Sequence, residues 1–143
     1  MFQRPYFPLL FLVFFTLVGC QNDADKERDI VNFEEYRGQW VIIHYWAEWC
    51  RSCMVEIADL NEIQADFPVK VFGFNADGLD RKALQILSKK VHIEYEQLMS
   101  DPKMTLGLEP LRGIPTLYLI SPEGVLVGPL EGPQSKAKIV SYF

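Results

Sequence analysis

The residues of this sequence best suited to chemistry are two cysteines, Cys50 and Cys53, separated by two residues. They follow a strand-like apolar run at residues 41–46 and begin a segment with helical spacing, so they fall in the first turn of a helix. The unpaired N–H groups and the dipole of a helix N-terminus favour a thiolate at Cys50. Cys53, one turn later, can attack a mixed disulfide formed by Cys50 and release the partner. The pair predicts thiol–disulfide exchange.

A metal site is the alternative use of this cysteine pair. Zinc normally takes four ligands, and the sequence has only three cysteines, with no second pair. A soft metal such as copper could use the two thiols together with His44 or Met54. We expect no bound metal and no other cofactor, and a copper-handling module remains the alternative hypothesis.

The N-terminal segment has the composition of an export signal. Residues 9–18 are almost wholly apolar, too short for a bilayer span of about 20 residues but suited to the core of a signal peptide. The segment ends in Leu-Val-Gly before Cys20, which resembles a bacterial lipoprotein lipobox. The resemblance implies a lipoprotein signal peptide at residues 1–19 and a lipid anchor on Cys20, in the cell envelope and facing the periplasm.

The residues after Cys20 predict how the chain is organised. Gln21 favours the outer membrane by resemblance to lipoprotein sorting. Residues 20–29 are polar and read as the lipidated cysteine and a tether, and residues 30–143 form one folded domain. If Cys20 carries lipid, Cys50 and Cys53 are left to pair with each other.

Composition narrows the function classes further. The chain has 143 residues, of which 49% are hydrophobic and 23% charged, which is globular and sufficient for one core. The net charge is −5 and no basic cluster occurs. Binding to nucleic acid is therefore not expected.

The elements that must position the cysteines follow from periodicity. Strands are predicted at residues 41–46, 69–74, 117–120 and 125–127, with a short extended segment at 95–99. Helices are predicted from Cys50 to Phe67 and at residues 81–90, 103–108 and 135–143, with a short helix or turn at 30–37. The first helix should bury Met54, Ile57, Ala58, Leu60 and Ile63. The order is a β-α-β half followed by a β-β-α half.

This order resembles the thioredoxin superfamily, and in particular its membrane-anchored TlpA-like branch. Three segments carry the resemblance: Tyr-Arg-Gly-Gln-Trp-Val at residues 36–41 leading to Tyr-Trp-Ala-Glu-Trp-Cys at 45–50, Arg-Gly-Ile-Pro-Thr at 112–116, and a helix–strand insertion at 81–99. It implies an α/β thioredoxin fold, with a central mixed sheet flanked by helices and the TlpA-like insertion.

The resemblance also implies roles for individual residues. Cys50 is the exposed nucleophile and Cys53 the buried resolving thiol. Pro115 is expected in cis, and Trp49, Ile114 and Pro115 are expected to bind an extended segment of the substrate.

The same resemblance implies a lipid-anchored, monomeric enzyme that reduces disulfides of exported proteins and is regenerated by a membrane reductase. A disulfide oxidant or isomerase, and a module that only binds its partners, are the other hypotheses.

His44 and Gly73 are departures from thioredoxin. His44 occupies the place of a buried Asp that handles the proton of the resolving thiol, and Gly73 falls where the partner Lys of that Asp stands. Neutral His44 could accept the proton of Cys53. Its competitor is Glu56, three residues after Cys53, which matches a Glu of the TlpA-like branch and is slightly favoured.

Arg51 and Ser52 lie between the two cysteines, and Ser52 is a second departure from the family pattern. Arg51 places a positive charge beside Cys50, and the Ser52 hydroxyl can hydrogen-bond a thiolate where most relatives have Pro. Both favour the reduced form and would raise the redox potential, so the sequence leaves the direction of electron flow open.

Overall fold

The computed structural model describes residues 31–143. The predicted signal peptide (residues 1–19), Cys20 and the tether (residues 20–29) lie outside the described residues. Within residues 31–143, no helix has the length and apolar character needed to cross a membrane.

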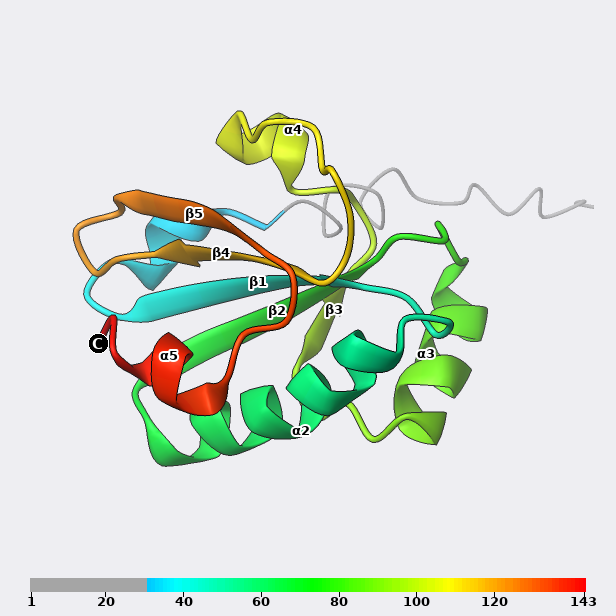
Figure 1. Ribbon diagram of the computed structural model, residues 1–143. Helices are drawn as coiled ribbons and strands as arrows, with labels where there is room; N and C mark the ends of the chain where they lie inside the picture. Colours follow the sequence, from blue (N-terminus) through cyan, green and yellow to red (C-terminus); the bar gives the residue numbers. More distant parts are fainter. Residues whose placement is uncertain (1–30) are drawn as a thin grey trace, which may run out of the picture.

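A mixed five-stranded sheet forms the centre of the molecule, as the sequence predicts (Figure 1). The strand order is β3-β2-β1-β4-β5. Strands β1, β2 and β3 run parallel to one another, whereas β4 is antiparallel to both β1 and β5. The strands are β1 (Trp40–Trp46), β2 (Val69–Asn75), β3 (Glu96–Leu98), β4 (Thr116–Ile120) and β5 (Leu126–Glu131).

Helices cover both faces of this sheet. Figure 1 shows α2, α3 and α5 on one side, with α4 and the short helix η1 on the other. The elements are η1 (Phe33–Tyr36), α2 (Arg51–Asp66), α3 (Arg81–Lys90), α4 (Lys103–Leu106) and α5 (Lys136–Val140). Against the sequence prediction, β5 is longer and α4 and α5 are shorter, while α3 and β3 form the expected insertion at the sheet edge.

Strand β1 is apolar almost throughout because it is covered on both faces. Alternate side chains point to opposite sides of a strand. Ile42 and Trp46 therefore enter the core under α2, whereas Val41, Ile43 and Tyr45 enter the core on the other face. His44, between Ile42 and Trp46, is consequently turned toward α2.

Helix α2 carries the cysteines and begins with Cys50 as its N-cap residue. It ends at Asp66 with Phe67 as its C-cap, directly before Pro68, within one residue of the predicted end. Its buried residues are Cys53, Glu56, Ile57, Leu60 and Ile63. The prediction for Ala58 was wrong: Ala58 is exposed, because at 3.6 residues per turn it lies roughly 140° around the helix from Cys53. The inward position next to Ile57 belongs to Glu56.

Candidate active site

A disulfide joins Cys50 and Cys53 at the start of α2. The Sγ of Cys50 accepts a hydrogen bond from the N–H of Cys53 at 3.2 Å, so the cysteine side chain itself caps the helix. Cys50 is 6% exposed and Cys53 is completely buried. Cys50 is therefore the sulfur that a partner reaches first, and the same N–H is placed to stabilise its thiolate once the bond is reduced.

The two residues between the cysteines both lie near Cys50. The Oγ of Ser52 is 3.6 Å from the Sγ of Cys50, a contact that a thiolate would strengthen by accepting the hydroxyl proton. The Arg51 side chain is exposed at the first residue of α2. The effect of Arg51 and Ser52 on the reduced state of Cys50 stays a prediction.

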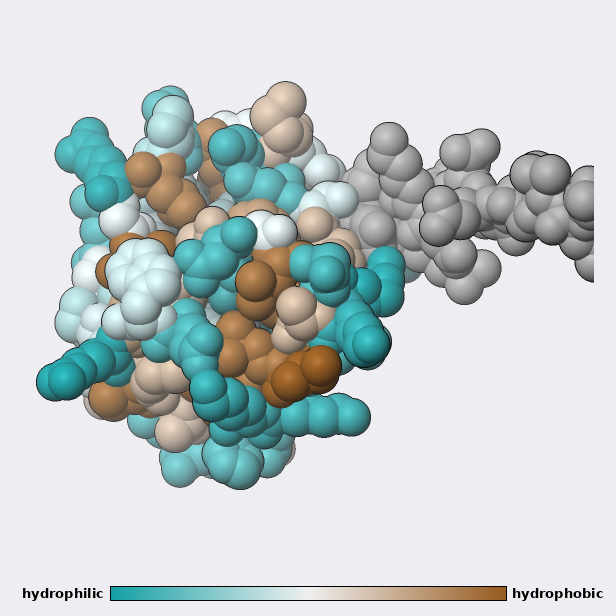
Figure 2. Space-filling view, turned by 90° about the vertical axis from the view of Figure 1, so that its right-hand side faces the viewer, coloured by the Kyte–Doolittle hydropathy of each residue, from teal (hydrophilic) through white to brown (hydrophobic). Residues whose placement is uncertain are grey.

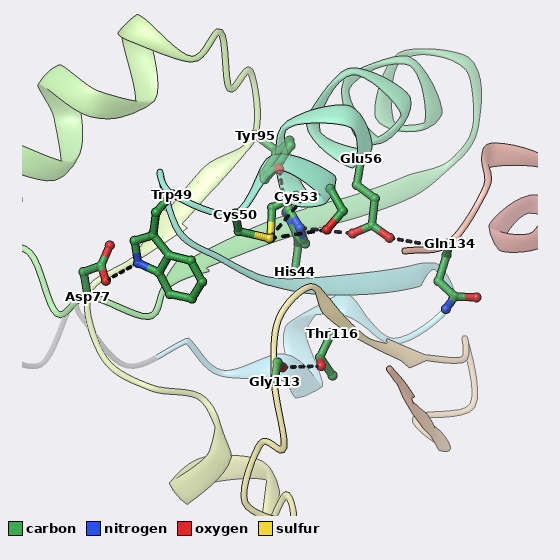
Figure 3. The surroundings of a disulfide bond; sticks show 11 residues. His44, Trp49, Cys50, Cys53, Glu56, Asp77, Tyr95, Gly113, Thr116 and Gln134 are labelled. Atoms are coloured by element: carbon green, nitrogen blue, oxygen red, sulfur yellow. Dashed lines mark hydrogen bonds and ion pairs between the residues drawn. A yellow bond between two sulfur atoms is a disulfide. The ribbon is translucent and has the colours of Figure 1, made fainter. Parts of the chain in front are cut away.

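Glu56 is a buried carboxylate one turn after Cys53. Its Oε1 accepts a hydrogen bond from the backbone N–H of Gln134, which comes from the segment before α5. Its Oε2 lies 3.3 Å from Nε2 of His44 (Figure 3). This contact lacks hydrogen-bond geometry, and neither atom has a hydrogen-bond partner among the described residues. His44 and Glu56 were considered as alternatives from the sequence, but the structure brings them together.

His44 has a second partner on its other ring nitrogen. The Tyr95 hydroxyl lies 2.9 Å from Nδ1. Burial lowers the pKa of His44, although the Glu56 carboxylate opposes this shift, and burial with the Glu56 charge raises the pKa of the Tyr95 hydroxyl. At neutral pH the imidazole is therefore uncharged and the tyrosine keeps its proton. The sequence analysis missed Tyr95 and Gln134.

Gly73 lies directly opposite His44 on β2. A Cβ at this position would come within 2.3 Å of Nε2 of Gln97. The Oε1 of Gln97 accepts a hydrogen bond from the Trp46 indole at 2.8 Å. A neutral amide from β3 therefore occupies the space beside Gly73, which leaves Glu56 and Tyr95 as the polar contacts of the His44 ring.

Trp49 is the largest exposed apolar side chain next to Cys50 and is 67% exposed. Its Nε1–H donates to Oδ1 of Asp77 at 3.0 Å (Figure 3). Asp77 lies in the turn after β2, where its N–H donates to the Asn75 side chain. This turn fixes the indole against the surface, a role for Asp77 that the sequence analysis did not anticipate.

The Ile114–Pro115 peptide bond is cis, as expected. The Thr116 hydroxyl donates to the Gly113 carbonyl at 2.8 Å and closes the loop, and Ile114 packs against the core cluster that contains both cysteines. A second cis bond, Gly128–Pro129, was not predicted. A groove of about 620 Å³ lies beside this loop and is lined by Glu109, Pro110, Leu111, Arg112, Pro129 and Glu131.

A second hollow lies on the other side of the active-site loop, toward α3. It has a volume of about 380 Å³ and is lined by Glu48, Leu79, Ala83, Ile86, Leu87 and Lys90. Figure 2, which faces this end of the molecule, shows apolar side chains gathered within a hydrophilic surround.

The copper hypothesis from the sequence used His44 or Met54 as a ligand together with the two thiols, and the structure bears on His44. Both of its ring nitrogens already face other groups, Tyr95 and Glu56. Within residues 31–143, His, Cys, Asp and Glu side chains form no group of three or more that could hold a metal ion.

A disulfide at a helix N-terminus on a mixed sheet, with a cis-proline loop whose Ile114 packs against the same core cluster, defines a class of enzyme: the thioredoxin-like thiol–disulfide oxidoreductases. The family comparison agrees with this class. The model of the AhpC/TSA family matches residues 14–128, and the chain belongs to that family.

Curated relatives include the thiol-disulfide oxidoreductase ResA of Bacillus cereus, 22% identical over 123 residues, covering 84% of this chain and 70% of the relative. The thiol:disulfide interchange protein DsbE of Allochromatium vinosum is 31% identical over 99 residues, covering 66% of this chain and 54% of the relative. Both relatives are therefore longer than the region they share with this chain.

Solved structures with the same fold include a thiol:disulfide interchange protein from Chlorobium tepidum, with a TM-score of 0.63 and 25% identity, covering 76% of this chain and 80% of the other. The exposed lipoprotein thioredoxin of Streptococcus pneumoniae has a TM-score of 0.63 and 22% identity, covering 77% and 87%. These structures support the thioredoxin-like fold.

Proposed function

We propose that this protein is a lipid-anchored, extracytoplasmic enzyme that reduces disulfides of exported proteins. The observation that carries the proposal is the disulfide between the barely exposed Cys50 and the buried Cys53, in the core cluster against which Ile114 of the cis-proline loop also packs. The names of the ResA and DsbE relatives support the chemistry. The lipobox-like sequence before Cys20 supports the anchor.

The reaction begins from the reduced pair. The Cys50 thiolate attacks one sulfur of the substrate disulfide, and a mixed disulfide forms while the other substrate sulfur leaves as a thiolate. Cys53 then gives up its proton, and its thiolate attacks the Cys50 sulfur. The second substrate thiolate leaves, the Cys50–Cys53 disulfide forms, and two electrons have passed to the substrate.

The proton of Cys53 is proposed to leave through the buried pair formed by Glu56 and His44. Cys53 is completely buried, so water cannot readily take its proton. The Glu56 and His44 pair lies one turn further along and beneath the disulfide (Figure 3). A group of this pair accepts the proton as the Cys53 thiolate forms, which is general base catalysis.

Trp49, Ile114 and Pro115 are proposed to hold the substrate. The backbone next to a cis proline can pair with an extended segment in the manner of an added strand, and the exposed Trp49 indole covers the approach to Cys50. Arg51 and Ser52 tune the thiolate. The domain works as a monomer, and a membrane reductase returns two electrons to the disulfide after each cycle.

The first experiment traps the substrate. In Cys53→Ser, the mixed disulfide on Cys50 cannot be resolved, so exported proteins should stay covalently joined to the chain and be released by dithiothreitol. Cys50→Ser is the matched control, because it keeps one cysteine but lacks the exposed nucleophile. Equal trapping by the two variants, or none by either, would refute the proposed roles of the cysteines.

A redox titration of the full chain decides the direction of electron flow. A reduction potential near the thioredoxin value of about −270 mV supports a reductase, whereas a value near about −120 mV would replace the proposal with a disulfide oxidant. The anchor is tested separately: Cys20→Ala should release the protein from membranes with an unchanged potential. The comparisons do not support the outer-membrane preference suggested by Gln21, so the proposal includes the anchor alone.

A further inference from the structure

Tyr95 provides a buried hydroxyl at the centre of the molecule. It lies directly before β3, in the helix–strand insertion, and its ring meets the His44 imidazole edge-on with centroids 6.3 Å apart. Its hydroxyl lies 2.9 Å from Nδ1 of His44, its one hydrogen-bond partner among residues 31–143. Neither the cysteines nor the substrate surface touch this hydroxyl, so the reaction as described gives it no role.

The positions of the protons determine which group donates in the hydrogen bond between Tyr95 and His44. The tyrosine keeps its proton, because burial and the Glu56 charge raise its pKa. The other tautomer of His44 would place the ring proton on Nδ1, and the Tyr95 proton would then be buried without an acceptor, which is costly. The hydroxyl therefore donates to Nδ1, and the ring proton of neutral His44 sits on Nε2.

That placement has a consequence on the opposite side of the ring. Nε2 lies 3.3 Å from Oε2 of Glu56, so this tautomer presents an N–H, and not a lone pair, on the side of the ring nearest the carboxylate. The N–H attracts the carboxylate, whereas a lone pair would repel it. Nε2 already holds a proton and Nδ1 is used by Tyr95, so neither nitrogen is free to accept a proton from Cys53.

Among residues 31–143, the elements packed around His44 contribute Glu56, Cys53 and Tyr95 as titratable groups. Its strand partners are Gly73 on β2 and Leu117 on β4. Helix α2 contributes Glu56 and, one turn before it, Cys53. Gln97, on β3 next to Gly73, is neutral.

We propose that Tyr95 is a positioning residue: by donating to Nδ1 it keeps the ring proton of His44 on Nε2, the nitrogen nearest Glu56, and Glu56 is thereby the group that accepts the proton of Cys53. The inference rests on the proposed function for its last step. It gives the insertion a task at the active site, since this segment delivers the hydroxyl.

Nitrogen NMR of the histidine rings tests the tautomer without any activity measurement. The full chain, held in detergent micelles, contains only two histidines, and exposed His92 provides the reference for a solvated ring. The expected result at neutral pH is a proton on Nε2 of His44. A proton on Nδ1 would overturn the inference. Because the measurement uses the parent protein, it tests the tautomer of His44 even if the variants described below do not fold.

The pH–rate profile of disulfide exchange tests the consequence. Tyr95→Phe keeps the ring but removes the donor, so the acid limb should move to higher pH by roughly 0.5–1 unit, the effect of losing one hydrogen bond. Tyr45→Phe is the matched control, because it also removes a buried tyrosine hydroxyl, one bonded to Asp101 at 2.9 Å on the other face of β1.

Two outcomes overturn the inference from this assay. One is a Tyr95→Phe profile that superimposes on that of the parent, and the other is an equal shift in both variants. Failure of the proposed function looks different, because the parent protein itself would then show no exchange at any pH while the tautomer of His44 could still be read.

Discussion

Acidification should destabilise this protein through His44. Burial lowers the pKa of His44 in the folded protein, with Glu56 opposing the shift, whereas in the unfolded chain an ordinary histidine titrates near about pH 6.5. Below that pH His44 is protonated in the unfolded chain but stays neutral in the folded protein, so the free energy of unfolding falls. The part of the free energy of unfolding that His44 contributes is fully present above about pH 6.5. It is lost as the pH falls toward the pKa of His44 in the folded protein.

The size of the effect follows from one proton. A difference of one bound proton changes the free energy of unfolding by about 1.4 kcal/mol per pH unit, so moving 1.5 units below the unfolded pKa removes up to about 2 kcal/mol. Urea unfolding of the oxidised protein, measured at several pH values between about 5 and 7.5, gives this slope. Other groups also contribute, so the quantity to compare is the slope of the parent minus that of a variant.

His44→Gln is the decisive variant. Its side-chain amide offers an N–H near the position of Nε2 but does not titrate, so the His44 part of the slope should vanish. His92→Asn is the control, because His92 is exposed and Asn tolerates its positive φ of 57°. Should His44→Gln keep the parent slope, the imidazole is not held neutral in the folded state and the argument fails.

Three further predictions concern the active site and the core. Glu56→Gln removes the proposed proton acceptor and should slow exchange at neutral pH about 100-fold or more, measured by stopped-flow. Gly73→Ala displaces the Gln97 amide and should lower the free energy of unfolding by about 1–3 kcal/mol, because a buried indole loses its acceptor. Leu60→Ala empties a completely buried site on α2 and should cost about 2–5 kcal/mol in urea unfolding, whereas exposed Val55→Ala should stay within about 0.5 kcal/mol.

Each of these has a matched control. Glu62→Gln removes an exposed carboxylate from the same helix, and a rate loss equal to that of Glu56→Gln would exclude a specific role for the buried group. Gly113→Ala meets no atom within 4 Å, so a cost as large as that of Gly73→Ala would disprove the explanation by Gln97. Equal costs for Leu60→Ala and Val55→Ala would contradict the packing of α2.

Local patterns in the sequence were enough to predict most of the fold. Apolar runs and helical spacing are properties of neighbouring residues, so the strands, helices and cysteine junction could be placed from them. Ala58 shows the limit of this method, since a small apolar residue and a buried carboxylate compete for one helix face. The sequence does not say that Glu56 has buried partners that stabilise it.

The partners of the site were less accessible because they lie far away in the chain. His44 and Glu56 could each be singled out, but their contact depends on how α2 packs across β1. Gln134 contributes only its backbone N–H, and no side-chain pattern reveals such a donor. Tyr95 could have been singled out from the sequence, although the signal is weak. It places a hydroxyl in a short extended segment whose other buried side chains are apolar.

The hydrogen bond from Gln134 to Glu56 links residues 78 positions apart in the chain. An amide proton bound to a carboxylate changes its resonance frequency when that carboxylate gains or loses charge. The peptide group of Gln134 is thus a built-in reporter, remote from both sulfurs. Following this single resonance during turnover would time the arrival and departure of the proton without a label on either cysteine.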